Sequence, residues 1–267
     1  MKRRSMLSCL MLSAVSAVST FTLAPSAQAA ALDEILKKKV LRVAVPQDFP
    51  PFGSVGPDMK PAGYDIDVAR LVAKELGVAV ELVPVTSANR IPYLNTKKVD
   101  LVVSSLGRNP EREKVIDFSI AYAPFFSGVY GSDKVALGKA DELAGKTVGV
   151  TRGAVEDLEL SKLAPASATI KRFEDNNATI AAFLSGQVPL IATGNVVAGA
   201  VSEKQPVNKL DFKFIIKNSP CHIGLNKGEP QLLERVNQIV EKAKQDGSLN
   251  AIAEKWLKLK RPVASFL

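Results

Sequence analysis

Strand-like and helix-like segments alternate along most of this chain, and this alternation restricts it to folds that layer helices on a sheet. Short apolar runs at 40–45, 79–83 and 101–103 have the length and β-branched content of buried strands. The intervening segments 65–76 and 89–94 have the character of helices, and the first carries apolar residues at helical spacing. This order is typical of a parallel sheet covered by helices and predicts the α/β class.

The alternation restarts after an extended, proline-started stretch at 123–130, which a helix would not contain. The segments expected after it are strands at 147–150, 169–173, 190–192, 212–216 and 221–225 and helices at 154–163, 177–185, 231–243 and 249–257. We therefore expect two lobes. The first comprises 30–125 and 222–267 and the second comprises 126–221. Residues 261–267 are expected to form a loose tail.

The N-terminal residues have the three parts of a secretory signal peptide. Three basic residues at 2–4 precede an apolar and small-residue stretch at 6–23, and Ala27-Gln28-Ala29 matches the cleavage pattern. A membrane anchor is the alternative, but serines and threonines interrupt the apolar stretch. We expect residues 1–29 to be a signal peptide cleaved near Ala29, and the mature protein to be periplasmic. The remaining 238 residues suffice for two lobes with cores.

Charge and cysteine content argue against nucleic acid as a partner and against an internal disulfide. The chain has a formal charge of +8, of which the signal supplies three positive charges. No basic block interleaved with aromatic residues appears, so nucleic acid is not an expected partner. The mature chain keeps one cysteine, Cys221, which excludes an internal disulfide and is expected to be a buried small hydrophobe.

The segment 101–122 carries the strongest sign of a binding site. An apolar run leads into a small polar loop in which Ser104, Ser105, Gly107 and Asn109 offer hydroxyls, an amide and a close-approach backbone, followed by Arg112. Such a loop can wrap a small anion, and Arg112 can clamp a carboxylate. A solvated arginine is the alternative from the loop alone.

The order of motifs resembles the family 3 extracellular solute-binding proteins, the polar amino-acid-binding components of ABC importers. The matching segments are LRVAVPQDFPPFG (41–53), GYDIDVA (63–69), TSANRIPYL (86–94), PEREKVIDFSIAY (110–122), LAGKTVGVTRG (143–153) and DGSLNAIAEKWL (246–257). The resemblance implies a two-lobed periplasmic-binding-protein type II fold, with two crossing strands as a hinge and the ligand enclosed between the lobes.

The resemblance also implies roles for residues of the first lobe. Arg112 would grip the α-carboxylate of the ligand, and Ser105 and Gly107 would add a hydroxyl and a backbone amide. The family commonly has serine or threonine at Gly107, so one hydroxyl contact is missing here. Phe49 and Tyr64 would flank the ligand side chain, with core packing as the alternative for each.

Arg90 bears on the type of ligand. The segment around it resembles that of the glutamate- and aspartate-binding members, in which an arginine faces the distal carboxylate. In the second lobe, the backbone amides of Ala154, Val155 and Glu156 open a helix and would bind the α-carboxylate when the lobes close.

Recognition of the ligand's amine departs from the family pattern. The usual aspartate is replaced by Gly194. Either Glu156, Thr193 or Asn195 reaches the amine, or the ligand has no free α-amino group.

The expected function is therefore capture of a polar, acidic amino acid or related dicarboxylate, hinge closure, and docking on ABC permease membrane subunits. We expect a monomer without cofactor, metal or catalytic residue. Asp65 and Asp67 suggest a metal or acid–base pair, but capping of their helix is the preferred interpretation. The alternative function is an exported cyclohexadienyl (prephenate or arogenate) dehydratase on the same fold, with Glu156 or His222 as proton donor.

Overall fold

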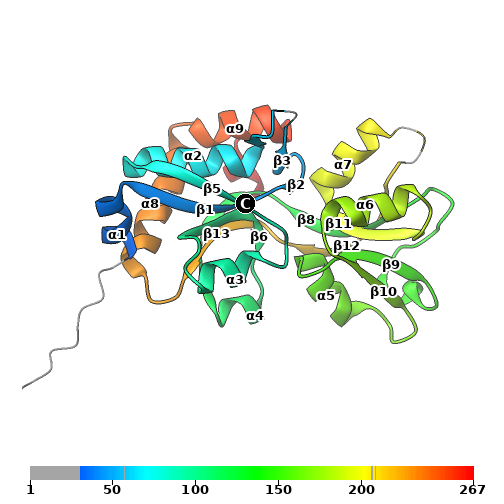
Figure 1. Ribbon diagram of the computed structural model, residues 1–267. Helices are drawn as coiled ribbons and strands as arrows, with labels where there is room; N and C mark the ends of the chain where they lie inside the picture. Colours follow the sequence, from blue (N-terminus) through cyan, green and yellow to red (C-terminus); the bar gives the residue numbers. More distant parts are fainter. Residues whose placement is uncertain (1–30, 57, 206, 208) are drawn as a thin grey trace, which may run out of the picture.

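The computed structural model describes residues 31–56, 58–205, 207 and 209–267, so the expected signal peptide at 1–29 lies outside the described residues. The chain forms two sheet-centred lobes side by side (Figure 1). The sheet of the first lobe has the strand order β5-β1-β6-β13-β7. Its strands are β1 (Val40–Pro46), β5 (Ala79–Val85), β6 (Leu101–Gly107), β7 (Ile116–Ala123) and β13 (Cys221–Asn226).

Helices cover both faces of this first sheet. The helices of this lobe are α1 (Ala31–Lys38), α2 (Tyr64–Leu76), α3 (Arg90–Asn95), α4 (Pro110–Glu113), α8 (Pro230–Gln245) and α9 (Ser248–Leu257). Strands β1, β5 and β6 are parallel, as the alternation predicts, whereas β13 runs antiparallel to β6 and β7. Helix α2 buries the face that its apolar spacing predicts and ends at Gly77, whose φ of 70° suits glycine.

The second lobe repeats this construction. Its sheet has the order β10-β9-β11-β8-β12, with parallel pairing among the first three strands and antiparallel pairing of β8 with β11 and β12. The strands are β8 (Phe126–Gly131), β9 (Thr147–Thr151), β10 (Thr169–Phe173), β11 (Leu190–Gly194) and β12 (Asp211–Asn218). The helices are α5 (Val155–Leu163), α6 (Asn176–Leu184), α7 (Asn195–Lys204) and a short 3-10 turn, η1 (Ala140–Leu143).

Two crossings join the lobes. The chain leaves the first lobe between β7 and β8, through Pro124 and Phe125, and returns between β12 and β13, through Ser219 and Pro220. The backbone N–H of Ser219 donates to the carbonyl of Phe125 at 2.9 Å, so the two crossings are bonded to each other. Cys221, which the sequence places at the end of the second lobe, is instead the first residue of β13, where it pairs with Gly107 and Ala123.

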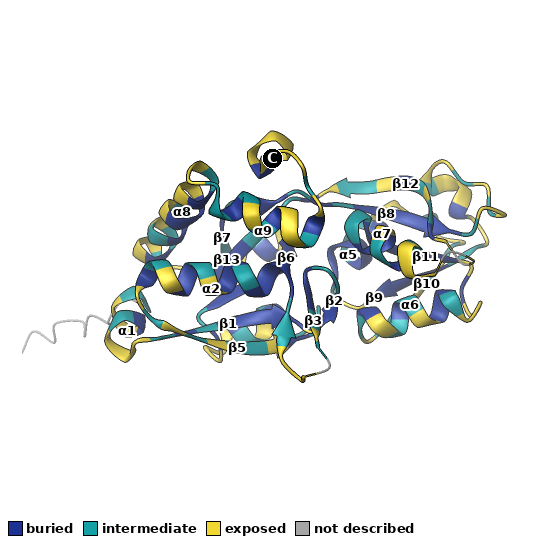
Figure 2. Ribbon diagram, turned by 90° about the horizontal axis from the view of Figure 1, so that it is seen from above, coloured by how far each residue is buried: buried dark blue, intermediate teal, exposed yellow. Residues whose placement is uncertain are grey.

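Figure 2 shows that the buried residues of both lobes lie mainly along the strands and the inner faces of the helices. In the first lobe one apolar cluster joins the sheet to α2, α8 and α9, and a smaller cluster joins the other face of the sheet to α3. In the second lobe α6 and α7 pack on one face and α5 on the other. The predicted α8 face is confirmed, with Leu232, Val236 and Ile239 among its buried residues.

A short sheet of β2 (Asp48–Phe49), β3 (Gly53–Val55) and β4 (Pro61–Ala62), absent from the sequence prediction, follows β1 at the side facing the second lobe. Two further expectations are wrong. Asp65 does not cap its own helix, because its oxygens accept hydrogen bonds from Tyr122 and Ser105. The tail after Arg261 is not loose: η2 (Val263–Phe266) buries Val263 completely, and the N–H of Val263 donates to Asn250 Oδ1 at 2.9 Å.

Candidate functional site

A pocket lies between the two lobes, where β1, β6 and the first crossing face α5 and α6. Its volume is about 20 Å³, which leaves room for about one water molecule. The lining residues are Pro46, Asp48, Phe49, Val85, Ser87, Arg90, Ser104, Ser105, Phe125, Ala154, Val155, Glu156 and Asn176. The lobes are therefore closed on each other, and the pocket brings together charged groups of both.

Arg90 enters the pocket from the first lobe, as the sequence leads us to expect. It opens α3, and its side chain is held by two backbone carbonyls: Nε donates to Ser87 at 3.1 Å and Nη1 to Ser104 at 2.7 Å. Arg90 is 5% exposed, and burial lowers its pKa, while the nearby carboxyl group of Glu156 acts in the opposite direction. The two carbonyls thus fix the position of the guanidinium group.

Glu156 enters the same pocket from the second lobe. It lies in the first turn of α5, where a carboxylate complements the helix dipole, and it is 4% exposed. Its Oε1 has no hydrogen-bond partner among the described residues. Burial raises the pKa of Glu156, and Arg90 and Arg112 oppose that shift. Ala154 and Val155 line the pocket beside it, so the start of α5 faces the first lobe.

A second carboxyl group, missed by the sequence reasoning, lies on the other side of the pocket. Asp48 Oδ2 accepts from the backbone N–H of Asn176 at 2.6 Å and from its Nδ2 at 3.2 Å, which joins β2 to the first turn of α6 in the other lobe. Burial raises the pKa of Asp48. Asp175, the N-cap of α6, was the available signal for this helix start, but nothing local in the sequence pairs Asn176 with Asp48.

Arg112 lies beside the pocket rather than in its lining. It is 4% exposed, and its Nη1 and Nη2 donate to the carbonyls of Gly107 at 2.7 Å and Gly153 at 2.8 Å. Burial, reinforced by the neighbouring charge of Arg90, lowers the pKa of Arg112 to about 9, so it stays charged near neutral pH. In this closed arrangement the predicted carboxylate clamp ties β6 of one lobe to the start of α5 in the other.

Ser105 lines the pocket with a strained backbone. Its φ is 41°, in the left-handed region that serine seldom adopts, and its N–H donates to Asp65 Oδ2 at 2.7 Å. The other oxygen of Asp65 accepts from the Tyr122 hydroxyl at 2.6 Å. Asp65 is fully buried, and burial raises its pKa to about 7. This buried carboxyl group therefore holds the backbone of Ser105 in position.

The aromatic residues divide between pocket and core. Phe49 lines the pocket and packs against Phe52 and Phe125, with ring centroids 5.8 and 6.2 Å away. Tyr64 is fully buried behind it, stacks on Tyr122 and donates to the Tyr122 carbonyl at 2.7 Å, so the core-packing alternative describes Tyr64.

Thr193, another residue implied by the resemblance, is 5% exposed on β11 and does not line the pocket.

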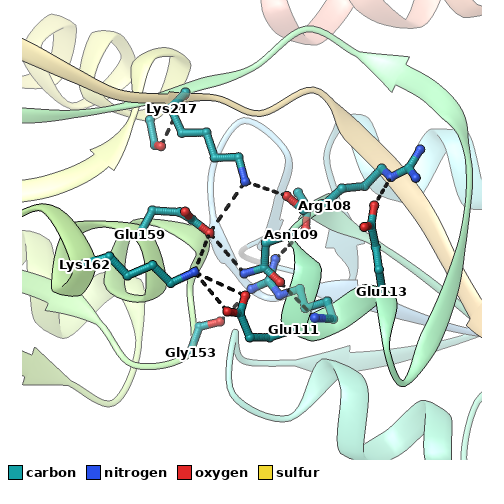
Figure 3. Close-up of polar contacts among 11 residues, drawn as sticks. Arg108, Asn109, Glu111, Glu113, Gly153, Glu159, Lys162 and Lys217 are labelled. Atoms are coloured by element: carbon teal, nitrogen blue, oxygen red, sulfur yellow. Dashed lines mark hydrogen bonds and ion pairs between the residues drawn. The ribbon is translucent and has the colours of Figure 1, made fainter.

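A network of polar contacts crosses the rim of the cleft (Figure 3). Lys162 Nζ of α5 lies 3.1 Å from Glu111 Oε1 of α4, and Lys217 Nζ lies 3.5 Å from Glu159 Oε1. Lys217 also donates to the carbonyl of Arg108 at 2.9 Å, and Asn109 Nδ2 donates to Glu159 at 3.3 Å. We call Asn109, Glu111, Glu159, Lys162 and Lys217 the rim network. It joins the lobes without lining the pocket.

Other candidate features lie outside the cleft. His222 is held on β13, with Nδ1 2.8 Å from the Ser119 carbonyl oxygen and its ring edge-on to Phe118. A cavity of about 380 Å³ under α1 is larger than the pocket, but its arginine, Arg42, is already bound to Asp100 at 2.6 Å. Within the part of the chain described, no cluster of three metal-ligating residues occurs, and no helix is long and apolar enough to cross a bilayer.

Comparison with known proteins identifies the family of this chain. The model of bacterial extracellular solute-binding proteins, family 3, matches residues 41–259. The chain belongs to this family. The L-cystine-binding protein TcyJ of Escherichia coli is 26% identical to this family 3 protein over 247 residues, which make up 91% of this chain and 92% of that one.

Solved structures of amino-acid-binding proteins have the same fold as this chain. ArgBP from T. maritima, in a mutant form, matches this family 3 protein with a TM-score of 0.80 at 29% identity, covering 86% of this chain and 100% of that chain. The ancestral amino acid-binding protein AncCDT-1, a precursor of cyclohexadienyl dehydratase, matches with a TM-score of 0.77 at 31% identity and the same coverage. The predicted type II fold of periplasmic binding proteins is thereby confirmed.

Proposed function

We propose that this protein is the substrate-binding component of an ABC importer, and that it captures a polar, acidic amino acid between its lobes. The observation that carries the proposal is the burial of Arg90 and Glu156, from opposite lobes, in one pocket. A guanidinium group can bind a carboxylate through paired hydrogen bonds, and a carboxylate can accept from an ammonium group. A pocket that contains both Arg90 and Glu156 can therefore bind the carboxylate and the ammonium group of one amino acid.

The acidic character of the ligand is argued from two neighbouring buried arginines, Arg90 and Arg112. Arg112 is close enough for the charge of Arg90 to lower its pKa, and the positive end of the α5 dipole points into the same space. Two buried cations that repel each other are stabilised by an anion between them. A second carboxylate on the ligand supplies that charge, in line with the resemblance of the Arg90 segment to glutamate and aspartate binders.

Amine recognition is assigned to Glu156. The side chain is buried, lines the pocket and has an acceptor oxygen that no described residue bonds, whereas Thr193 does not line the pocket. Asn195, the remaining candidate, accepts the backbone N–H of Phe126 at 3.2 Å through its Oδ1. An ammonium group next to Glu156 would also favour its ionised form, which burial alone disfavours.

Transport requires the lobes to open, because the closed pocket has no room for an amino acid. The two crossings beside Phe125 and Ser219 are the hinge of this motion, and the ligand shifts the equilibrium toward the closed form by binding groups of both lobes. The closed monomer then docks on the permease. The expected signal peptide directs export to the periplasm and is cleaved near Ala29. Names of matched proteins, such as the L-cystine-binding protein TcyJ, support transport of an amino acid.

The test uses the mature chain, residues 30–267, with calorimetric and thermal-shift titrations of L-glutamate, L-aspartate, L-glutamine, L-cystine and L-arginine. We expect L-glutamate or L-aspartate to raise the melting temperature most, and Arg90→Ala to weaken that ligand at least about tenfold. Arg70→Ala is the control, because Arg70 pairs with Asp67 away from the cleft. The proposal fails if no amino acid binds, or if Arg90→Ala binds the best acidic ligand as tightly as the wild type.

One observation favours a second candidate, the dehydratase. Glu156 is a buried acid of raised pKa in the pocket, as a proton donor to a departing hydroxyl group requires, while His222 is held outside it. The match to AncCDT-1 concerns a protein described as a precursor of such an enzyme. Incubation with prephenate, followed by ultraviolet absorbance of the aromatic product, distinguishes the two functions. Product formation that Glu156→Gln abolishes would replace the binding proposal.

A further inference from the structure

Two buried side-chain polar atoms have no hydrogen-bond partner among the described residues, one in the pocket lining and one on the second crossing. One is Glu156 Oε1, which the proposed function uses. The other is the Oγ of Ser219, a residue of the second crossing that is 3% exposed. Buried hydroxyl groups are nearly always hydrogen-bonded, since an unsatisfied one destabilises the folded state. The hydroxyl of Ser219 therefore needs an explanation.

This hydroxyl occupies the space that a side chain at position 107 would fill if Gly107 had one. A Cβ built on Gly107 would lie 2.1 Å from Ser219 Oγ, which no real side chain tolerates, and 3.6 Å from the Cβ of Val155 in the other lobe. Gly107 ends β6 two residues after the pocket residue Ser105. Its carbonyl accepts from Arg112 Nη1 at 2.7 Å. Ser219 Oγ thus lies against Gly107 of the pocket strand, at a position that also faces Val155 at the start of α5.

We propose that Ser219 is a ligand-binding residue, whose hydroxyl the second crossing delivers into the space over Gly107 to donate a hydrogen bond to the ligand's carboxylate. This inference rests on the proposed function. Serine at 219 and glycine at 107 form a matched pair, because only one of the two positions can fill that space. The hydroxyl that Gly107 cannot supply from β6 comes instead from the hinge.

The first experiment deletes the hydroxyl. Mature wild type and Ser219→Ala are titrated by calorimetry with L-glutamate, L-aspartate, L-glutamine, L-cystine and L-arginine, and the amino acid that the wild type binds most tightly is compared. We expect Ser219→Ala to bind it about tenfold more weakly or worse, because a hydrogen bond to a charged group is lost. The melting temperature of the ligand-free protein should stay equal or rise, because an unpartnered buried hydroxyl is removed. Ser185→Ala, in a serine that donates to the Ala182 carbonyl at the end of α6, should leave affinity unchanged.

The second experiment moves the hydroxyl. Gly107→Ser alone forces a clash with Ser219 and should lower both affinity and melting temperature. Gly107→Ser combined with Ser219→Gly puts the hydroxyl on β6 and should recover most of the affinity.

Three results would overturn the contact while leaving the proposed function intact: unchanged affinity in Ser219→Ala, a parallel loss of affinity and thermal stability in that variant, or no recovery in the double variant. If the wild type binds none of the amino acids, the proposed function fails and this contact fails with it.

Discussion

The ring of Phe125 fills the space into which a side chain at Gly194 would project. A Cβ built on Gly194 would lie 2.2 Å from each of two Phe125 ring carbons. The first crossing and the end of β11 are therefore fitted to each other, with an aromatic residue at one position and no side chain at the other. The aspartate typical of the family at 194 is sterically incompatible with Phe125 in this position.

Restoring that aspartate should consequently harm the protein rather than improve it. Gly194→Asp is expected to lower the free energy of unfolding by about 1–3 kcal/mol, as overpacking of a close-packed site does. Urea denaturation measures the change. Gly199→Asp is a matched control, because a Cβ at Gly199 meets no atom within 4 Å. Phe125→Ala should relieve the Gly194→Asp defect, and equal stability of Gly194→Asp and wild type would contradict the clash.

Asp65 should make stability depend on pH. Its pKa in the folded protein is about 7, above the ordinary 3.8, so the folded state holds this proton more tightly than the unfolded chain. Below about pH 4 both states are protonated. As pH rises from about 4 to 7 this group lowers the free energy of unfolding, with a slope of at most about 1.4 kcal/mol per pH unit.

Asp65→Asn removes that dependence, because asparagine stays neutral. The variant still loses one good hydrogen bond, because Tyr122 and Ser105 donate to different oxygens of Asp65 and asparagine keeps only one of these acceptors. We expect it to be less stable than the wild type at pH 5, by a difference that shrinks toward pH 8. Chemical denaturation at the two pH values measures this difference. A difference that grows with pH would mean that the folded-state pKa is lowered instead.

The rim network should tune closure without touching the ligand. Lys162 and Glu111 join the lobes through exposed side chains, so their ion pair is weak and salt-sensitive. Lys162→Met is expected to weaken ligand binding a few-fold at low salt and less at high salt, as calorimetry at two ionic strengths would show. Lys38→Met breaks an ion pair within α1 and should have no effect. An effect of Lys162→Met that is independent of salt would exclude this role.

Cys221 should be chemically silent in the folded protein. It is fully buried at the start of β13, and burial raises the pKa of its thiol well above the ordinary value. We expect no reaction of the mature chain with a thiol-specific chromogenic reagent at pH 8, and one equivalent of reaction in urea. Rapid labelling without denaturant would show that β13 detaches from β6 and β7.

Sequence patterns predicted the repeated strand and helix units because buried parallel strands require continuous apolar runs, as in β1 and β6. They missed α7, whose apolar residues have little helical periodicity, and the short β2–β4 sheet. The tail was mispredicted because its order depends on one distant contact, between Val263 and Asn250. Local patterns do not encode such contacts.

The site likewise contains residues that local motifs indicated and contacts that they did not. Motif position pointed to Arg90, Ser105 and Glu156, which line the pocket, because each lies within or at the start of an element that local patterns specify. The link from Asp48 to Asn176 and the fit of Ser219 over Gly107 join residues more than one hundred positions apart. The closed arrangement of the two lobes brings Asp48 to Asn176, whereas the pairing of β13 with β6 brings Ser219 to Gly107.

The most direct test of the account compares L-glutamate with glutarate, which has the same two carboxylates and no amine. Calorimetry on the mature wild type and on Glu156→Gln, with Glu174→Gln at the exposed start of α6 as control, measures whether Glu156 reads the ammonium group. We predict that the wild type and the control prefer L-glutamate at least about tenfold and that Glu156→Gln loses this preference. Equal binding of the two ligands by the wild type, or an unchanged preference in Glu156→Gln, would contradict it.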